Sequence, residues 1–112
     1  MGSMPIFYKI KKKENIYKNG DIISAEEGEI ILLTSKQDFK LNSIIWDIYG
    51  TNGEQDLLII DHKTFIKILE QYRKEVKEEK EYLYWEHFIA EELGLINELF
   101  DFSNYYLGYC YI

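Results

Sequence analysis

The hydrophobic pattern of the chain changes its period near residue 61, and this change limits the folds open to it. Before residue 61, apolar residues alternate with polar ones or form short runs, as they do in β-strands. After it, they recur every three or four residues, as they do in amphipathic helices. A parallel sheet needs a helix between successive strands, and the first sixty residues show no such helical pattern. The sequence therefore predicts an α+β fold with an antiparallel sheet.

The first thirty residues carry two signals of β-structure. Over residues 6–11, Ile6, Tyr8 and Ile10 alternate with Phe7 and two lysines, which is typical of a half-buried strand. The dipeptide Asn19-Gly20 then separates residues 16–17 from residues 22–23. Asn-Gly tolerates the positive φ angles of a two-residue turn, so we expect a β-hairpin at this point.

Three longer apolar runs complete the expected sheet. Residues 30–33 form a continuous apolar run, which is suited to a central strand. Residues 44–49 and 57–60 form a second candidate pair of strands. The segment 50–53, with a glycine at each end, is expected to turn the chain between them.

Two helices are expected after residue 60. Asp61 is a suitable N-cap for the first, since its carboxylate can accept from the free amides of the first turn. The second is expected from about residue 81 to residue 93, with Gly94 in a left-handed C-terminal cap. The apolar stripe of the first helix is Phe65, Leu69, Tyr72 and Val76. That of the second helix is Tyr82, Trp85, Ile89 and Leu93.

The last segment, residues 105–112, is rich in aromatic β-formers and is interpreted as a returning strand. We therefore expect one α+β domain over residues 4–112. It should have an antiparallel sheet of about four to six strands, two main helices packed on one face and a C-terminal returning strand. If segment 105–112 is an edge strand, its apolar side chains favour a homodimer over a monomer. Residues 1–3 look like an expression scar.

Charge is distributed unevenly along the chain. The net charge is −7, which argues against direct binding to a nucleic-acid backbone. Residues 1–43 carry a balance of +1, and residues 44–112 carry a balance of −8. No Lys or Arg follows Lys80, whereas ten of the eighteen aromatic residues do. The acidity is therefore concentrated in a segment that is also rich in aromatic rings.

Residues that carry catalysis or bind metals are sparse. His87 and Glu91 lie four positions apart on one helical face, but they lack the further ligands that a zinc site requires. Cys110 lies in an aromatic segment, where it is expected to be a small apolar filler. No segment comes near the ~20 apolar residues that span a bilayer. We therefore expect no enzymatic activity, no metal, no cofactor and no membrane insertion, and we expect a cytoplasmic location.

The remaining functional signal is the combination of carboxylates with aromatic rings. Tyr84 and Glu91 share the outward face of the second helix, and Glu98, Asp101 and Tyr105 follow it. These five are the predicted partner-binding residues, because basic surfaces attract carboxylates and tyrosine adds contact area at low entropic cost. An acidic surface that serves only solubility is the competing interpretation.

The leading hypothesis is a non-enzymatic binding protein that inhibits a basic protein. Its partner would be a nuclease toxin or a nucleic-acid-binding effector, the kind of target that immunity proteins and anti-CRISPR proteins neutralise. These proteins illustrate a class of small acidic inhibitor and are not a sequence resemblance. The alternative is a structural or assembly subunit that forms homo-oligomers through exposed strands.

Overall fold

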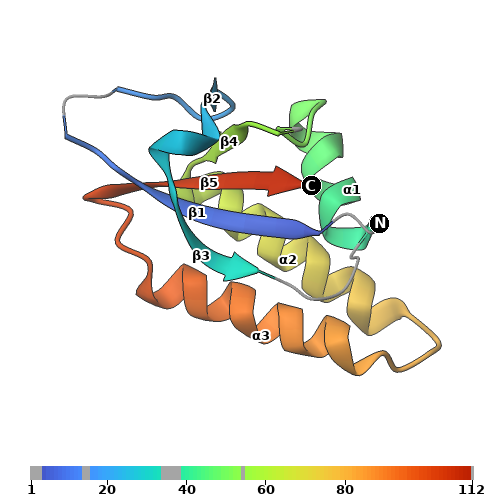
Figure 1. The fold of residues 1–112 in the computed structure, drawn as a ribbon. Coiled ribbons are helices and arrows are strands. Elements are labelled where there is room, and N and C mark those ends of the chain that lie inside the picture. Colours follow the sequence, from blue (N-terminus) through green and yellow to red (C-terminus); the bar gives the residue numbers. More distant parts are fainter. Residues whose placement is uncertain (1–3, 14–15, 34–38, 54, 112) are drawn as a thin grey trace.

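The computed structural model describes residues 4–13, 16–33, 39–53 and 55–111. Within these ranges the chain forms a five-stranded antiparallel sheet and three α-helices (Figure 1). The predicted α+β class, antiparallel sheet and returning C-terminal strand are confirmed. In chain order the elements are β1 (Pro5–Lys11), β2 (Ile22–Ile23), the 3₁₀-helix η1 (Ala25–Glu27), β3 (Glu29–Leu33), α1 (Phe39–Tyr49), β4 (Leu57–Ile60), α2 (His62–Glu78), α3 (Tyr84–Leu99) and β5 (Tyr105–Tyr111).

The strands lie in the order β2-β4-β5-β1-β3, so β5 is the central strand. It pairs with β1 over seven residue pairs and with β4 on its other side. The prediction that segment 105–112 could be an edge strand is therefore wrong. Leu107, Tyr109 and Cys110 of β5 are fully buried. A strand rich in apolar residues on both faces is what a central position requires.

The apolar run at residues 30–33 belongs to β3, which is an edge strand and not the predicted central one. Ile30 is 53% exposed and Ile31 is 36% exposed, so these two residues do not join the core as expected. The run was ambiguous because burial of a strand depends on which strands become its neighbours. Only β1 pairs with β3 among the described residues.

Residues 44–49 form the last part of helix α1 and not the predicted strand. Leu41, Ile44 and Ile45 are buried, and their spacings of three and one place them on one side of a helix. A short apolar run fits either a buried strand or a buried helix, because periodicity cannot distinguish the two over so few residues. As a result, β4 pairs with β2 and β5 instead of with residues 44–49.

The predicted turn at Asn19-Gly20 is present, but the predicted hairpin is not. Gly20 has φ +91°, and the Asp21 N–H donates to the Lys18 carbonyl at 3.0 Å. Beyond the turn, β2 pairs with β4 and not with residues 16–17. Ile16 is exposed. The dipeptide therefore determined the local turn without determining the strand that follows it.

Each face of the sheet has its own hydrophobic core. The three helices pack on one face (Figure 1). On that face Phe7, Leu58 and Tyr109 meet the apolar side chains of the helices. The other face carries a smaller core around Tyr8 and Ile59. Partly buried side chains from the segment between β1 and β3 cover that smaller core; they are Tyr17, Ile23 and Ala25.

The two predicted helices are present with altered bounds. Asp61 caps α2 as predicted, since its carboxylate accepts from the Thr64 N–H at 2.8 Å. The predicted stripe of α2 is buried. Helix α3 begins at Tyr84 and continues to Leu99, so Gly94 lies within it and is not its C-terminal cap. Tyr82 precedes the helix and is exposed, contrary to its predicted place in the core.

Candidate partner-binding surface

Helix α3 lies beside the edge of the sheet and packs against α2 (Figure 1). Ile89 and Leu93 are buried in the core on the helical face of the sheet, and Trp85 is partly buried against it. Gly94 is also buried, and the guanidinium group of Arg73 from α2 occupies the space beside it. These contacts fix which side of α3 is left outward.

The outward side of α3 combines carboxylates with large apolar groups. Tyr84, Glu91 and Glu98 are all exposed and follow one another at intervals of seven residues. Seven residues make nearly two helical turns, so the three lie along one stripe. Three exposed apolar side chains accompany them. We call the whole set the α3 face; it comprises Tyr84, Phe88, Glu91, Leu95, Glu98 and Leu99.

The α3 face is negatively charged. Glu91 and Glu98 belong to it, and Glu92 lies beside it on the same helix. In the described part of the chain, the ion pairs involve other carboxylates, those of Glu29, Glu79 and Glu86. The α3 face therefore keeps its charge available to a partner.

An apolar groove of about 250 Å³ separates α3 from strand β3. We call it the β3–α3 groove. Five of its six lining side chains are apolar, and Glu92 is the sixth. Leu95 and Leu99 belong both to the groove and to the α3 face, so the two surfaces are continuous. The lining residues are Ile31, Glu92, Leu95, Ile96, Leu99 and Phe100.

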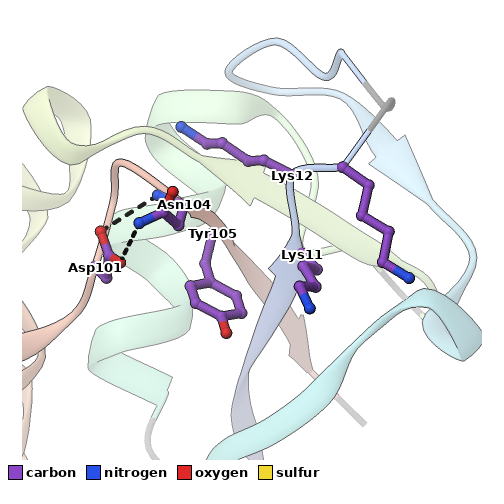
Figure 2. A pocket seen from close by; sticks show the side chains of 6 residues that line it. Lys11, Lys12, Asp101, Asn104 and Tyr105 are labelled. Atoms are coloured by element: carbon purple, nitrogen blue, oxygen red, sulfur yellow. Dashed lines mark hydrogen bonds between the residues drawn. The ribbon is translucent and has the colours of Figure 1, made fainter.

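Asp101 and Tyr105 lie in a different pocket, beyond the C-terminal end of α3 (Figure 2). Lysines from the end of β1 contribute most of its remaining lining, and its volume is about 480 Å³. Antiparallel pairing of β1 with β5 places Lys11 opposite Tyr105. The ammonium group of Lys9 lies 5.4 Å from the centre of the Tyr105 ring. We call this the lysine pocket; its residues are Lys11, Lys12, Lys13, Asp101, Asn104 and Tyr105.

Local hydrogen bonds hold the Asp101 carboxylate. Asn104 donates to it twice, from its side-chain amide to Oδ2 at 2.7 Å and from its backbone N–H to Oδ1 at 3.3 Å (Figure 2). The Ser103 N–H also donates to Oδ1, at 3.1 Å. The Asn104 side chain is the main cause of a lowered pKa at Asp101. The charge of Lys12 contributes to the same effect. Asp101 therefore turns the chain between α3 and β5 in addition to adding charge.

The structure thus divides the five predicted residues between two places. Tyr84, Glu91 and Glu98 lie on the α3 face, and Asp101 and Tyr105 line the lysine pocket. The charges after Lys80 predicted an acidic surface that did not include Lys9 and Lys11, which reach Tyr105 through strand pairing. The run of lysines in β1 was the available signal.

A second pocket, of about 410 Å³, adjoins the lysine pocket through Lys12 and Tyr105. His62 lies in its wall, where the ring stacks on Phe102 with centroids 4.1 Å apart. One ring nitrogen of His62 lies 2.9 Å from Asn97 Oδ1. Lys12 donates to the Phe102 carbonyl at 2.6 Å. These contacts connect the loop before β5 to α2, α3 and β1.

A cluster of charged groups joins the three helices. Lys40 of α1 forms ion pairs with Glu79, the residue after α2, and with Glu86 of α3. Glu86 is only 5% exposed. A hydrogen bond with Glu86, followed by one from Lys40, lowers the pKa of Glu79. The cluster therefore lies at the junction of the three helices, where its role is structural.

The other candidate reactive residues stand apart from one another. His87 is exposed and stacks on Tyr82 at 4.4 Å between ring centroids. Cys110 is fully buried, and burial, with a smaller effect from the charge of Asp56, raises its pKa. In the described residues no group of three or more His, Cys, Asp or Glu side chains is placed to hold a metal ion.

Comparison with known proteins gives no relative: no family model, curated protein or solved structure matches the chain. Over the ranges that the structure describes, none of the helices is long and apolar enough to cross a membrane.

Proposed function

We propose that this chain is a non-enzymatic binding protein that neutralises a basic protein by covering it with the α3 face. The observation that carries the proposal is the stripe of Tyr84, Glu91 and Glu98, flanked by exposed apolar side chains on the same helix. Its partner is a nuclease toxin or a nucleic-acid-binding effector whose functional surface is basic. The proposed location is the cytoplasm, where such effectors act.

The composition of the α3 face supports this proposal. Tyr84 is 66% exposed and Leu99 is 76% exposed, so both lose water contact only when a partner covers them. Buried aromatic anchors such as Tyr84 carry much of the affinity in protein interfaces, and apolar neighbours such as Leu99 exclude water around them. The surrounding carboxylates attract a basic partner and orient it before contact. A surface that served solubility alone would gain nothing from exposed Phe88, Leu95 and Leu99.

The alternative function, assembly of homo-oligomers, depends on exposed strand edges. The central position of β5 removes the strand on which the prediction of a homodimer was based. The edge of β3 remains, but Glu29 belongs to this strand and Glu92 of α3 lines the groove beside it. Two copies that met at this edge would bring like charges together, so we favour a basic partner.

Binding to purified basic proteins tests the proposal. A panel of cationic nucleases and DNA-binding proteins is titrated with the chain, and complex formation is followed by light scattering and calorimetry. We expect at least one member to bind, with association slowing as salt shortens the Debye length to about 8 Å at physiological ionic strength. The double variant E91K/E98K should lose this binding while it unfolds at nearly the same temperature, because exposed charges contribute little to stability.

The matched control is E70K/E78K, which makes the same change of charge on the exposed side of α2. This variant should bind as the wild-type chain does. Equal loss of binding in both double variants would show that total charge, and not the α3 face, determines association. Binding that survives in E91K/E98K and is lost on substitution of Lys9 and Lys11 would place the interface at the lysine pocket.

A further inference from the structure

The outer edge of β3 offers unpaired backbone groups. β3 ends the sheet, and its register with β1 runs from Glu29 opposite Lys9 to Leu33 opposite Ile6. In an antiparallel pair, alternate residues direct their N–H and C=O groups away from the partner strand. Over the described residues no further strand pairs with that side. Such an edge is a template for another strand.

The two edges of the sheet differ in length. β2 has two residues, too few to accept a strand, whereas β3 has five. β3 also carries an irregularity opposite Phe7 and Tyr8, where Ile31 is the additional residue between the paired positions. Ile31 lines the β3–α3 groove. Ile31 therefore gives an incoming strand an apolar contact next to the backbone groups.

Charge determines which kind of segment suits this edge. Glu29 begins β3, Glu92 lines the groove, and Glu91 and Glu98 lie on the adjoining α3 face. Lys9 lies 3.6 Å from Glu29, but no lysine or arginine lines the groove. An occupant with alternating apolar and basic side chains would bury its apolar side chains in the groove and pair its basic side chains with these carboxylates.

We propose that the β3 edge and the β3–α3 groove together bind an extended basic segment of the partner, which adds to the sheet as a sixth strand. This inference rests on the proposed function and specifies how the partner is held. Backbone hydrogen bonds to β3 fix the segment, and the groove takes alternate side chains. The acidic face of α3 then determines that the segment is basic.

Two synthetic peptides of equal charge test the inference. The first alternates valine and lysine, and the second has the same lysines with proline in place of alternate valines. Proline lacks an N–H and cannot form a strand ladder. Binding is measured by fluorescence titration, and amide hydrogen exchange is followed residue by residue. The valine peptide should slow exchange of β3 amides and bind about tenfold more tightly than the proline peptide.

A pair of matched variants locates the contact. I31K/L95K places lysines in the groove, and we expect about tenfold weaker binding of the valine peptide because charge repulsion replaces apolar contact. The control is I48K/I66K on α1 and α2. Ile66 has the same 36% exposure as Ile31, and Ile48 at 44% matches Leu95 at 47%. The control should bind the peptide as the wild-type chain does.

Failure of the inference differs from failure of the proposed function. If both peptides bind equally and β3 amides exchange at unchanged rates, the sixth strand is refuted while the acidic α3 face still binds basic chains. If neither peptide binds while a basic protein still binds the α3 face, the inference fails and the proposed function stands. If E91K/E98K leaves the binding of basic proteins and of the valine peptide unchanged, both proposals fail. A different result would come from self-association. If the β3 amides are already protected from exchange without peptide, and sedimentation equilibrium gives a dimeric mass, a second copy of the chain occupies the edge.

Discussion

Gly94 of α3 lies directly against Arg73 of α2: a β-carbon at position 94 would lie 2.6 Å from Arg73 Nη2. The guanidinium group therefore occupies space that any other residue would need for its side chain. The contact lies at a glycine that resembles a helix cap in the sequence but stands inside a helix. It is part of the junction between the two helices, which pack along one another.

The Gly94–Arg73 contact predicts a coupling between two substitutions. Alanine at position 94 should stabilise the helix by about 0.5–1 kcal/mol through its higher helix propensity. In the wild-type background that gain is offset because the Arg73 side chain must move. We expect G94A to be more stabilising in an R73A background than alone. Urea unfolding of the four members of this cycle measures the difference. Equal effects in both backgrounds would show that Arg73 does not limit position 94.

Loss of the Asp61 cap should destabilise the fold. D61A removes the acceptor of the Thr64 N–H, and we expect a cost of about 1 kcal/mol in the free energy of unfolding. D61N is the matched control, since asparagine caps helices as well as aspartate does. It should retain most of the stability in urea unfolding. An equal loss in D61N would indicate that charge, and not the hydrogen bond, is the important property.

The charged cluster of Lys40, Glu79 and Glu86 predicts how stability depends on pH. The pKa of Glu79 is lowered from 4.5, so its contribution is present above that value and is lost as pH falls through the lowered pKa. Burial lowers the pKa of Lys40, but its hydrogen bond to Glu79 and the charge of Glu86 outweigh burial and raise that pKa above 10.5. The contribution of Lys40 is therefore present below 10.5 and is lost as pH rises through the raised pKa.

Substitution of Glu79 by glutamine isolates the acid limb. The free energy of unfolding of E79Q, measured by urea titration at a series of pH values, should fall less steeply below pH 4.5 than that of the wild-type chain. E70Q, on the exposed side of α2, should follow the wild-type curve. If the curves of E79Q and the wild-type chain are parallel below pH 4.5, Glu79 is not the group that links acid to stability.

Cys110 should react slowly with thiol reagents while the protein is folded. Its side chain is buried in the smaller core, and burial raises its pKa, so little thiolate is present at neutral pH. Labelling in urea should be rapid, and labelling under native conditions should follow the rate of unfolding. Rapid native labelling would show that β5 opens far more readily than its central position indicates.

The sequence predicts a segment well where local signals determine its structure. Asp61 with the stripe of Phe65 and Tyr72 determines α2 locally, because the cap and the helical period agree. Residues 30–33 and 44–49 were placed wrongly because a short apolar run fits several environments. Only the distant pairing of β5 with β1 and β4 decides which run becomes the centre of the sheet.

The contrast between local signals and distant strand pairing also decides which parts of the candidate surface could be predicted. Tyr84, Glu91 and Glu98 could be placed together because the helical repeat is local. Tyr105 could not be placed near Lys9 and Lys11 without knowledge of the β1–β5 register. The β3–α3 groove was also hidden, since it depends on which strand lies at the edge beside α3.

The position of β5 also governs how this chain acquires its structure. β1 and β4 lie on either side of β5 and are not adjacent, so neither is paired with the other before β5 arrives. The pairing of Pro5 with Tyr111 closes a loop that spans nearly the whole described chain. Contacts between such distant residues slow folding, because the entropy of loop closure is lost before the contacts form. During synthesis, the central ladder therefore forms only after residue 111 has left the ribosome, and until then the apolar faces of β1 and β4 lack the strand that covers their inner edges.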